Sequence, residues 1–394
     1  LIKYKMPQPY QQKIVVTGGL GFIGSHTVVA LQEQGYEVVI IDDLSNSSLE
    51  VLDGITAITH QKPLFEQIDL KDTKALSAFF KKHSNIEGII HFAAYKAVGE
   101  SVSKPLEYYE NNVGGLLHIL QEMKRSNQIV PFIFSSSCTV YGQADKLPIT
   151  EDAPIKKANS PYGNTKQIGE EILFDTTQST PELHVISLRY FNPIGAHPSL
   201  EIGELPIGTP QNLVPFITQT AAGLHKKLTV FGNDYPTPDG TCIRDYIHVI
   251  DLAKAHVVAL QRLLLGNQSA HYEVFNLGTG TGSSVLEVIQ SFERSSGISL
   301  PYEIGARRSG DIVAAYADTT KANKVLGWKT EKTIDEAIDS AWKWEQKLRK
   351  AYLSVCCQIA MDRVIYAADR HQILNGQSMG IGQIRQLFEF CAFG

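Results

Sequence analysis

Short apolar runs alternate with amphipathic stretches along the first half of the chain. The apolar runs, which we expect to be buried strands, lie at residues 14–17, 37–41, 65–68, 88–92, 131–136 and 184–190. Between them, apolar residues recur on one helical face at residues 24–34, 72–83, 105–125 and 162–178. Regular alternation of strands and helices is typical of a parallel sheet with helices on both faces. The pattern therefore predicts an α/β protein with a doubly wound parallel sheet.

The pattern changes near Phe191, where loops rich in glycine, proline and asparagine take over. GELPIGTPQN and GNDYPTPDG are two such loops. Long irregular loops in a compact protein commonly bind ligands. The later elements that we expect are a helix near 251–265, a strand at 272–277, and helices near 284–295 and 333–350. Residues 351–394 show no pattern that connects them to this architecture.

Composition excludes several classes of partner. The 394 residues are enough for two lobes or more, and 43% hydrophobic with 20% charged residues is ordinary for a globular enzyme. The net charge of −5 is small for this length, which argues against a nucleic-acid partner. No apolar stretch reaches the roughly 18 residues that a membrane span needs, so we expect no membrane partner.

Cysteine usage and the first residues bear on location. The cysteines at positions 138, 242, 356, 357 and 391 show neither zinc-ligand spacing nor an even disulfide framework. The start, LIKYKMPQPYQQ, lacks the apolar core of a signal peptide. We therefore expect reduced cysteines, no bound metal and a cytoplasmic location. We also expect residues 1–12 to be an extension, in which residues 1–5 are extraneous and Met6 is the natural start.

The segment TGGLGFIG places three glycines between the first expected strand and the first expected helix. Gly18, Gly21 and Gly24 would allow a tight turn and close approach to a ligand, while the helix N-terminus favours pyrophosphate. Three glycines alone are a weak signal. Their position between a strand and a helix strengthens it, because a dinucleotide-binding turn occurs in that order of elements. The next strand ends at Asp42-Asp43, where a carboxylate would bind ribose hydroxyls and repel a 2′-phosphate. Without the glycines this pair is as readily a solvated strand end; with them it favours NAD over NADP.

The segment SPYGNTK places Tyr162 four residues before Lys166. Ser160 and Pro161 are favourable N-cap and first-turn residues, so both side chains would lie on one face of a new helix. A nearby cation favours the phenolate and lowers a tyrosine pKa from its reference of about 10, which makes the phenol a base near neutral pH. A lone tyrosine in polar company is more often a surface or packing residue, and the spacing to Lys166 keeps the catalytic interpretation open.

A serine run, FSSSCTVYG, directly follows the strand expected at 131–136. Ser137 would lie at the carboxyl end of that strand, where open α/β sheets bind ligands. Serines after strands are usually turns. Combined with Tyr162 and Lys166, however, Ser137 would complete an acid–base set of phenol, hydroxyl and cation. These three residues are the candidate catalytic set.

Seven segments of the chain together resemble the extended short-chain dehydrogenase/reductases, and within them the UDP-galactose 4-epimerase family. They are TGGLGFIGSHT, HFAAYKAVGESVSKPLEYYENNV, FSSSCTVYG, SPYGNTK, LRYFNPIGAHPS, VFGNDYPTPDGTCIRDYIHVIDLA and RRSGD. The resemblance extends from about residue 13 to 347. It implies a Rossmann-type NAD-binding domain over residues 13–190, with returning elements near 246–278. It also implies a smaller C-terminal α/β lobe over residues 191–350 that binds the nucleotide sugar.

The resemblance further implies roles for individual positions. Residues that match the family's NAD contacts are Gly18, Gly21, Phe22, Ile23, Gly24, Asp42, Asn46, Ser47, Asp69, Leu70, Phe92, Ala93, Lys96, Asn111, Tyr162 and Lys166. Residues that match its UDP-sugar contacts are Ser137, Tyr162, Asn192, Asn212, Leu213, Phe231, Arg244, Arg308 and Ala315. Arginine suits phosphate because its planar fork binds two oxygens at once. Taken alone, Arg244 is more readily an ion-pair partner of Asp245, and its place in a long matching segment reverses that interpretation.

The implied reaction interconverts UDP-galactose and UDP-glucose through a transient 4-keto sugar and tightly bound NAD. Tyr162, as phenolate, would take the proton from the sugar 4-hydroxyl while hydride leaves C4. Ser137 would hydrogen-bond the same oxygen, and the keto sugar would rotate and take hydride back on its other face. Lys166 and the positive nicotinamide would both lower the tyrosine pKa.

Two alternatives share the same fold. A nucleotide-sugar 4,6-dehydratase or decarboxylase is one; dehydratases need an added acid and base, and in them an acidic pair follows the strand-end hydroxyl. In this chain Cys138, Thr139 and Val140 follow Ser137, with no carboxylate. A non-catalytic NAD-sensing regulator is the other, but such proteins typically lose the Tyr–Lys pair that this chain retains. Both alternatives are therefore less favoured than an epimerase.

Ala315 bears on substrate breadth. Some family members carry a tyrosine that faces the sugar here, and members with a small residue resemble those that also handle N-acetylated sugars. A methyl in place of an aromatic ring leaves space beside the sugar 2-position for an acetamido group. Tyr316 could enter this space, although a shift of one residue on an extended segment points its side chain the opposite way. We therefore expect activity on UDP-GlcNAc and UDP-GalNAc as well.

The resemblance also implies a homodimer. Residues after about 350 have no counterpart that we recognise in the family. We expect this tail to be dispensable.

Overall fold

The computed structural model describes residues 12–308 and 311–351. The chain divides into two compact units, residues 1–342 and residues 343–394. In the second unit the described residues, 343–351, are helical. The strands of the described residues all belong to the first unit. The expectations for residues 1–5 and for the tail after 351 concern segments outside the described residues.

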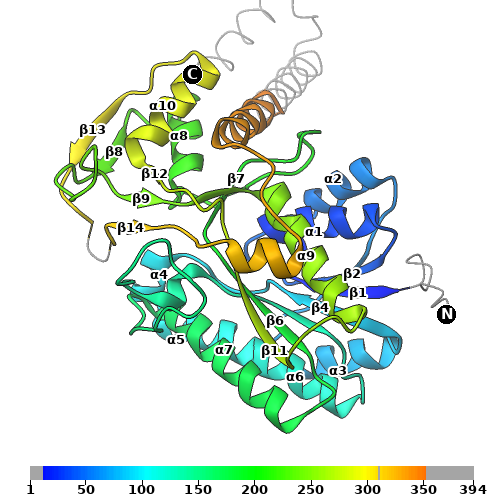
Figure 1. Ribbon diagram of the computed structural model, residues 1–394. Helices are drawn as coiled ribbons and strands as arrows, with labels where there is room; N and C mark the ends of the chain where they lie inside the picture. The colour runs from blue at the N-terminus through cyan, green and yellow to red at the C-terminus, as the bar shows by residue number, and fades with distance from the viewer. Residues whose placement is uncertain (1–11, 309–310, 352–394) are drawn as a thin grey trace, which may run out of the picture. The chain divides into compact units, whose positions relative to one another are not determined.

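A seven-stranded sheet runs through the first unit (Figure 1). Its order is β11-β6-β5-β4-β1-β2-β3, and every neighbouring pair is parallel. The strands are β1 (Lys13–Thr17), β2 (Glu37–Asp42), β3 (Leu64–Gln67), β4 (Ile86–His91), β5 (Phe132–Ser135), β6 (Val185–Tyr190) and β11 (Tyr272–Leu277). The predicted doubly wound parallel sheet is confirmed, and the strand expected at 272–277 joins it as the seventh.

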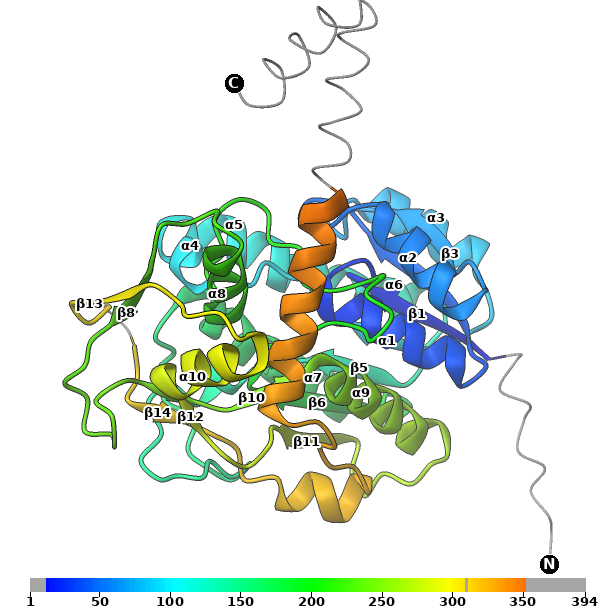
Figure 2. The same ribbon diagram turned by 90° about the horizontal axis from the view of Figure 1, so that it is seen from above.

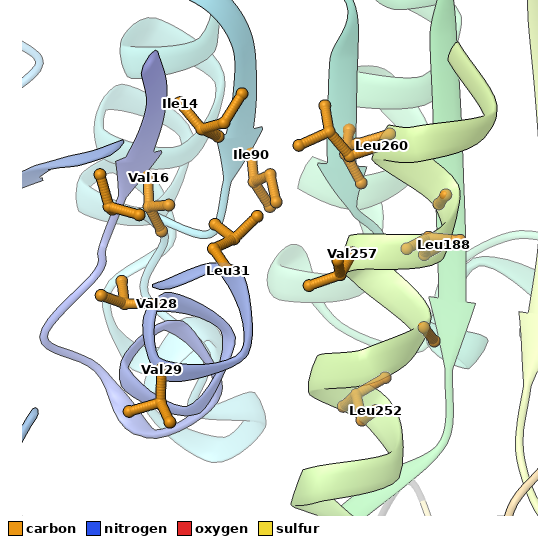
Figure 3. Packing of buried hydrophobic residues seen from close by; sticks show 14 of the residues in the cluster. Ile14, Val16, Val28, Val29, Leu31, Ile90, Leu188, Leu252, Val257 and Leu260 are labelled. Carbon is orange, nitrogen blue, oxygen red and sulfur yellow. The ribbon is translucent and has the colours of Figure 1, made fainter. Parts of the chain in front are cut away.

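Helices cover both faces of this sheet (Figures 1 and 2). On one face lie α1 (Phe22–Glu33), α2 (Glu50–Thr59) and α9 (Val249–Leu264), and on the other α3 (Thr73–Lys82), α6 (Gly115–Arg125) and α7 (Pro161–Ser179). Successive strand residues point to opposite faces, so β1 sends Ile14 and Val16 toward α1 and α9 but Val15 toward α3 and α6. Figure 3 shows Ile14 and Val16 beside Leu31 of α1, with Leu260 of α9 across from them. Burying each such side chain stabilises the fold by roughly 1.5–3 kcal/mol.

Some helices differ from the sequence prediction. Helix α2 was not predicted, because Gly54 and β-branched residues weaken its helical pattern; it forms where Val51, Leu52 and Ile55 pack on the sheet. The short helix α4 (Val98–Ser103) was not predicted either. The single helix expected over 105–125 is divided into α5 (Pro105–Tyr108), a π-helical turn (Tyr109–Gly114) and α6.

The chain after β6 forms short strands and a separate apolar cluster. Strand β7 (Asn192–Ile194) pairs with β10 (Tyr246–His248), and β8 (Leu228–Phe231) pairs with β13 (Tyr302–Gly305). Strand β9 (Ile243–Arg244) lies between β12 (Ser283–Ser284) and β14 (Ala314–Ala315). Helices α8 (Leu213–Ala221) and α10 (Val285–Ser296) lie beside β8 and β13 in both views (Figures 1 and 2). They share an apolar cluster with residues 334–342, which are helical. The division into two domains near residue 190 stays a prediction.

A buried ion pair joins α7 to β6. Arg189 Nε donates to both carboxylate oxygens of Glu170, at 2.9 and 3.2 Å, and the side chains are only 7% and 9% exposed. Ser136 also donates to this carboxylate, and Arg189 Nη1 donates to the Tyr141 hydroxyl at 3.0 Å. Tyr141 in turn donates to Asn276 of β11 at 2.6 Å. The network therefore connects the segment after β5 with α7, β6 and β11.

Replacing Arg189 with methionine should lower the free energy of unfolding by about 3–5 kcal/mol, because it leaves the Glu170 carboxylate buried without a cation. Denaturant unfolding measures this loss. The double variant Arg189→Met/Glu170→Gln should recover part of it, since the unpaired charge is gone. Arg294→Met breaks an exposed pair with Asp335 and should cost less than about 1 kcal/mol. Equal losses in Arg189→Met and Arg294→Met would contradict the role of burial.

Candidate active site

The predicted residues gather at one edge of the sheet, where its parallel strands end. Gly18 directly follows β1, Phe92 directly follows β4, and Asp42 is the last residue of β2. Ser137 lies two residues beyond β5, and Asn192 opens β7 just beyond β6. Strands β2 and β3 lie on one side of β1, and β4 lies on its other side. Strand order therefore reverses between β1 and β4. Open α/β sheets bind ligands at the carboxyl edge beside such a reversal.

The glycine turn after β1 leaves no space for side chains. Gly18 has φ of 68°, in the left-handed region that favours glycine. A Cβ on Gly18 would lie 2.7 Å from the Ala93 nitrogen, and one on Gly24 would lie 2.1 Å from the Gly18 oxygen. Gly21 N donates to the Gly18 oxygen at 3.1 Å, which closes the turn. Helix α1 follows with Phe22 and Ile23 in its first turn and no side-chain cap, so its first N–H groups could hold a phosphate.

Asp42 is buried at the end of β2 and organises the loop after it. Its Oδ2 accepts from Leu20 N at 3.0 Å, and its Oδ1 accepts from Leu44 N at 3.0 Å and from the Ser47 hydroxyl at 2.7 Å. Burial raises the pKa of Asp42, and these hydrogen bonds partly offset that effect. A carboxylate offers about four acceptor sites, so one remains for a hydroxyl such as that of a ribose. The neighbouring Asn46 is exposed.

Asp69, Leu70 and Asn111 come together beyond β3. Lys71 Nζ lies 3.3 Å from an Asp69 oxygen and donates to the Asn111 amide oxygen at 3.3 Å. Leu70 is buried against Gly115, the first residue of α6. Sequence analysis missed Lys71, although its position directly after Asp69-Leu70 was a signal for a second polar group there.

The loop after β4 links two predicted sets of residues. The Phe92 ring packs 4.6 Å from that of His256, and Ala93 N donates to the Thr17 hydroxyl at 3.4 Å. Lys96 Nζ donates to Glu204 Oε1 at 3.1 Å, and Asn212 Nδ2 donates to the same oxygen at 2.9 Å. Glu204 therefore bridges a predicted cofactor residue and a predicted substrate residue. Sequence analysis did not identify Glu204.

Helix α7 brings Tyr162 and Lys166 together as predicted. Ser160 caps the helix by accepting from Gly163 N at 3.1 Å, and Pro161 is its first residue. Lys166 Nζ lies 6.0 Å from the centre of the Tyr162 ring. It donates to the Ser135 carbonyl at 2.6 Å. The Ser137 hydroxyl is near enough to Tyr162 to lower the pKa of its phenol, so phenol, hydroxyl and cation are neighbours in a buried site.

The pKa of Tyr162 differs from the sequence expectation, which was a lowering by Lys166. Burial raises the pKa of Tyr162, and Tyr190 raises it further, while the Ser137 hydroxyl lowers it. The expected lowering by Lys166 together with the nicotinamide stays a prediction, but it omitted burial, which is the largest effect on this pKa in the structure. Burial also lowers the pKa of Lys166 to about 8, although Glu170 raises it. At neutral pH, Lys166 is therefore charged and Tyr162 is a neutral phenol in this structure.

The two predicted phosphate-binding arginines meet at one carboxylate. Arg308 Nη2 donates to Asp311 Oδ1 at 2.8 Å, and Arg244 Nη2 lies 3.7 Å from the same oxygen. The Arg308 guanidinium lies 5.7 Å from the centre of the Phe231 ring. The alternative that Arg244 pairs with Asp245 does not hold, because the Asp245 carboxylate accepts from other groups.

The other predicted substrate residues lie in separate elements. Asn192 N donates to the Asp245 carbonyl at 2.9 Å. Asn212 is the N-cap residue of α8 and Leu213 the first residue of that helix. Ala315 is buried in an apolar cluster with Val140, Tyr141 and Phe191, against which Cys138 packs. A Cβ on Gly282 would lie 3.1 Å from the ring of Tyr316. The side chain of Tyr316 is thus directed to Gly282, outside the Ala315 cluster, as strand alternation predicts.

The described residues contain neither a cluster suited to a metal ion nor a helix suited to a membrane. Within residues 12–308 and 311–351, no three or more His, Cys, Asp or Glu side chains are grouped so that they could hold a metal ion. In the same described ranges, every helix is too short or too polar to cross a membrane.

Comparison with known proteins gives consistent matches. The family model described as GDP-mannose 4,6 dehydratase matches residues 15–341. UDP-glucose 4-epimerase from Neisseria meningitidis serogroup B is 49% identical over 333 residues, which cover 84% of this chain and 97% of that relative. The crystal structure of UDP-glucose-4-epimerase from Stenotrophomonas maltophila, with bound NAD and formylated UDP-arabinopyranose, matches with a TM-score of 0.83 at 46% identity. It covers 86% of this chain and 100% of its own. The crystal structure of UDP-glucose 4-epimerase from Bifidobacterium longum, in complex with NAD+ and UDP, matches with a TM-score of 0.81 at 46% identity. The match covers 85% of this chain and 98% of that chain.

Replacing Gly24 with alanine should weaken dinucleotide binding by at least about tenfold, since ~1.4 kcal/mol of strain suffices for that factor. The added Cβ would meet the Gly18 oxygen and displace the turn. Calorimetric titration with NAD measures the change. Gly114→Ala is the matched control, because no atom lies within 4 Å of a Cβ there. Unchanged affinity in Gly24→Ala would show that the turn does not approach the ligand.

Proposed function

The chain belongs to the UDP-glucose 4-epimerase family, and from this premise we propose that Tyr162, Lys166 and Ser137 are its catalytic residues. It is an NAD-dependent isomerase that interconverts UDP-galactose and UDP-glucose through a transient 4-keto sugar. The observation that carries the residue assignment is the burial of a phenol, an ammonium and a hydroxyl side by side at the carboxyl edge of the sheet. The family model named for a dehydratase describes a related activity, but no carboxylate follows Ser137 to support water loss.

The residues at this edge fit NAD. Gly18 and Gly24 allow the turn to pack directly against the loop after β4 and the start of α1, so backbone N–H groups rather than side chains would face a pyrophosphate there. Asp42 has an acceptor site for a ribose hydroxyl. Asp69, Leu70 and Asn111 would hold the adenine end, and Phe92, Ala93 and Lys96 would lie along the cofactor. The chemistry that NAD supplies when bound is acceptance of hydride from the sugar and its return.

Tyr162 serves as the base for the sugar 4-hydroxyl. Removing a proton from a buried phenol requires positive charge nearby, since burial disfavours the phenolate. Lys166 supplies this charge from within the chain and keeps it up to about pH 8. The Ser137 hydroxyl, which lies near the Tyr162 phenol, relays the proton between sugar and phenol.

The substrate half holds the nucleotide firmly and the sugar loosely. Arg244 and Arg308 face one carboxylate and are suited to bind the diphosphate together. Asn192, Asn212, Leu213 and Phe231 provide the remaining contacts to the UDP-sugar. A firm hold on UDP with a loose sugar allows the keto sugar to rotate and accept hydride on its other face.

The assembly proposed is a homodimer. Val98, Val102 and Leu106 on the successive helices α4 and α5 are 48%, 64% and 78% exposed. Grouped exposed apolar side chains are typical of protein–protein interfaces. A cytoplasmic location is also proposed, and the free thiols of Cys138 and Cys242 support it.

Wild-type protein incubated with UDP-glucose and no added cofactor should form UDP-galactose. The Tyr162→Phe variant should have a turnover at least about 100-fold lower, which is the smallest effect usually seen when an acid–base group is removed. Phenylalanine preserves the ring but removes the proton-accepting oxygen. Product is measured by chromatography of the nucleotide sugars, and UDP binding by calorimetry.

Tyr316→Phe is the control for loss of a phenol outside the site. UDP affinity should be retained in both variants. A Tyr162→Phe enzyme that epimerises within a few-fold of wild type would mean that the base is misassigned. A stable 4-keto-6-deoxy product from wild type would point to a dehydratase, and no reaction to a regulator.

Ala315→Tyr should abolish activity on UDP-GalNAc while sparing UDP-galactose, because a tyrosine ring fills the space beside the sugar 2-position. Specificity constants for both substrates in wild type and variant measure this. Tyr316→Ala is the control, since that side chain is directed to Gly282 and its removal should leave the ratio unchanged. A wild-type enzyme inert toward UDP-GalNAc would show that another residue closes the pocket.

A further inference from the structure

Asp245 is a fully buried carboxylate that lies between β9 and β10. Its Oδ1 accepts from Thr279 N at 2.8 Å and from the Thr279 hydroxyl at 2.7 Å. Its Oδ2 accepts from Gly280 N at 3.2 Å and from Ala317 N at 3.1 Å. Each oxygen therefore has two donors, and the donors come from two segments distant in sequence.

No cation offsets this charge within the described ranges, 12–308 and 311–351. The adjacent Arg244 is directed toward Asp311 and toward the carbonyls of Ile243 and Ile312. A buried carboxylate without a cation is costly unless hydrogen bonds satisfy it, and four donors do so here. Such a residue is not needed to fill the core, because an apolar side chain would do so at lower cost. Its value must lie in the segments that the donors fix.

Those segments carry the proposed substrate residues. Asp245 N donates to the Ala315 carbonyl at 3.0 Å, and the Asp245 carbonyl accepts from Asn192 N at 2.9 Å. In the register of β9 and β14, Ala315 pairs with Arg244. The carboxylate holds the same strand again at Ala317, two residues farther on. The backbone of Asp245 thus contacts Asn192 and Ala315, and its side chain contacts Ala317. In the sequence it directly follows Arg244.

The fit around the carboxylate is close. A Cβ on Gly278 would lie 2.3 Å from Asp245 Oδ2 and 2.8 Å from the Ala317 Cβ. The carboxylate therefore fills the space between the 278–280 loop and the strand that contains β14. Strand β9 is only two residues long, as is β14, so their backbone pairing alone gives few hydrogen bonds to resist a shift. The side chain of Asp245 adds four hydrogen bonds, which connect β9 to the 279–280 loop and to the strand that contains β14.

We propose that Asp245 is a positioning residue for the nucleotide-sugar half of the site, which fixes β14 and the 279–280 loop against β9 so that Arg244 and Ala315 face the same substrate. The inference rests on the proposed function, in which those two residues bind UDP-sugar. Asp245 itself touches neither the substrate nor the reacting atoms. Its loss affects binding of UDP more than the chemical step, because none of the hydrogen bonds of its carboxylate reaches Tyr162, Lys166 or Ser137.

The first test is Asp245→Asn in the full-length enzyme. Asparagine has the same shape, but its amide nitrogen is a donor. Facing Gly280 N and Ala317 N it would lose both hydrogen bonds, and facing Thr279 it would lose at least the one from the N–H. We expect the Kd for UDP, measured by calorimetry, and the KM for UDP-galactose to rise about tenfold or more, the effect of ~1.4 kcal/mol. The kcat should stay within a few-fold, and bound NAD, measured by absorbance after denaturation, should be retained.

The second test removes one donor and is gentler on folding. Thr279→Val lacks the hydroxyl but keeps the backbone N–H, so the Kd for UDP should rise less than in Asp245→Asn. Thr279→Ser keeps the hydroxyl and should bind UDP as wild type does. If Asp245→Asn does not fold, the comparison of the Kd for UDP in Thr279→Val and Thr279→Ser tests the positioning role.

Asp251→Asn is the matched control. Asp251 is also buried, and its Oδ2 accepts from Glu331 N and Lys332 N at 2.9 and 2.8 Å, but it ties down no proposed binding residue. The amide nitrogen can take the position of Oδ1, which has no hydrogen-bond partner among the described residues, so this variant should keep both hydrogen bonds and leave the Kd for UDP unchanged.

These variants distinguish failure of the positioning role of Asp245 from failure of the proposed function. Unchanged UDP affinity in both Asp245→Asn and Thr279→Val overturns the positioning role, as does an equal loss of affinity in Asp251→Asn. A selective rise in Kd with near-normal kcat supports it. A wild-type protein that neither binds UDP nor epimerises would instead overturn the proposed function, and the inference with it.

Discussion

Because all seven strands of the sheet are parallel, their carboxyl ends meet at one edge, and the site depends on this constraint. Gly18, Ser137 and Asn192 are far apart in sequence, yet each comes just after a strand of the same sheet. The reversal of strand order at β1 and β4 opens this edge to a ligand. The turn after β1 and the loop after β4 then approach so closely that Gly18 admits no Cβ.

Burial governs the electrostatics at this edge. It raises the pKa of Tyr162 and lowers that of Lys166 to about 8, so both residues favour their neutral forms relative to water. The nearby Glu170, neutralised by Arg189, raises the Lys166 pKa and is itself fixed by Ser136. Three successive serines after or within β5 thus act on different groups: Ser135 holds Lys166, Ser136 holds Glu170 and Ser137 lies near Tyr162.

Carboxylates connect the two halves of the site. Glu204 accepts from Lys96 on the cofactor side and from Asn212 on the substrate side. Asp311 approaches both Arg244 and Arg308. Asp245, next to Arg244, accepts hydrogen bonds from the 279–280 loop and from Ala317 beyond β14. In the function we propose, these acids position cations and backbone segments, and proton transfer is left to Tyr162 and Ser137.

Sequence alone determined the features that depend on local pattern. Alternating apolar runs predicted six strands of the parallel sheet, the glycines predicted the tight turn, and the Ser-Pro start with i, i+4 spacing placed Tyr162 beside Lys166. Tertiary structure decided what depends on contacts between distant segments. Helix α2 forms because its apolar face packs on the sheet, despite a weak local pattern. The tyrosine pKa rises because other elements bury it. Asp245 stands next to Arg244 in sequence yet binds Thr279, Gly280 and Ala317, since only the folded chain brings those donors to it.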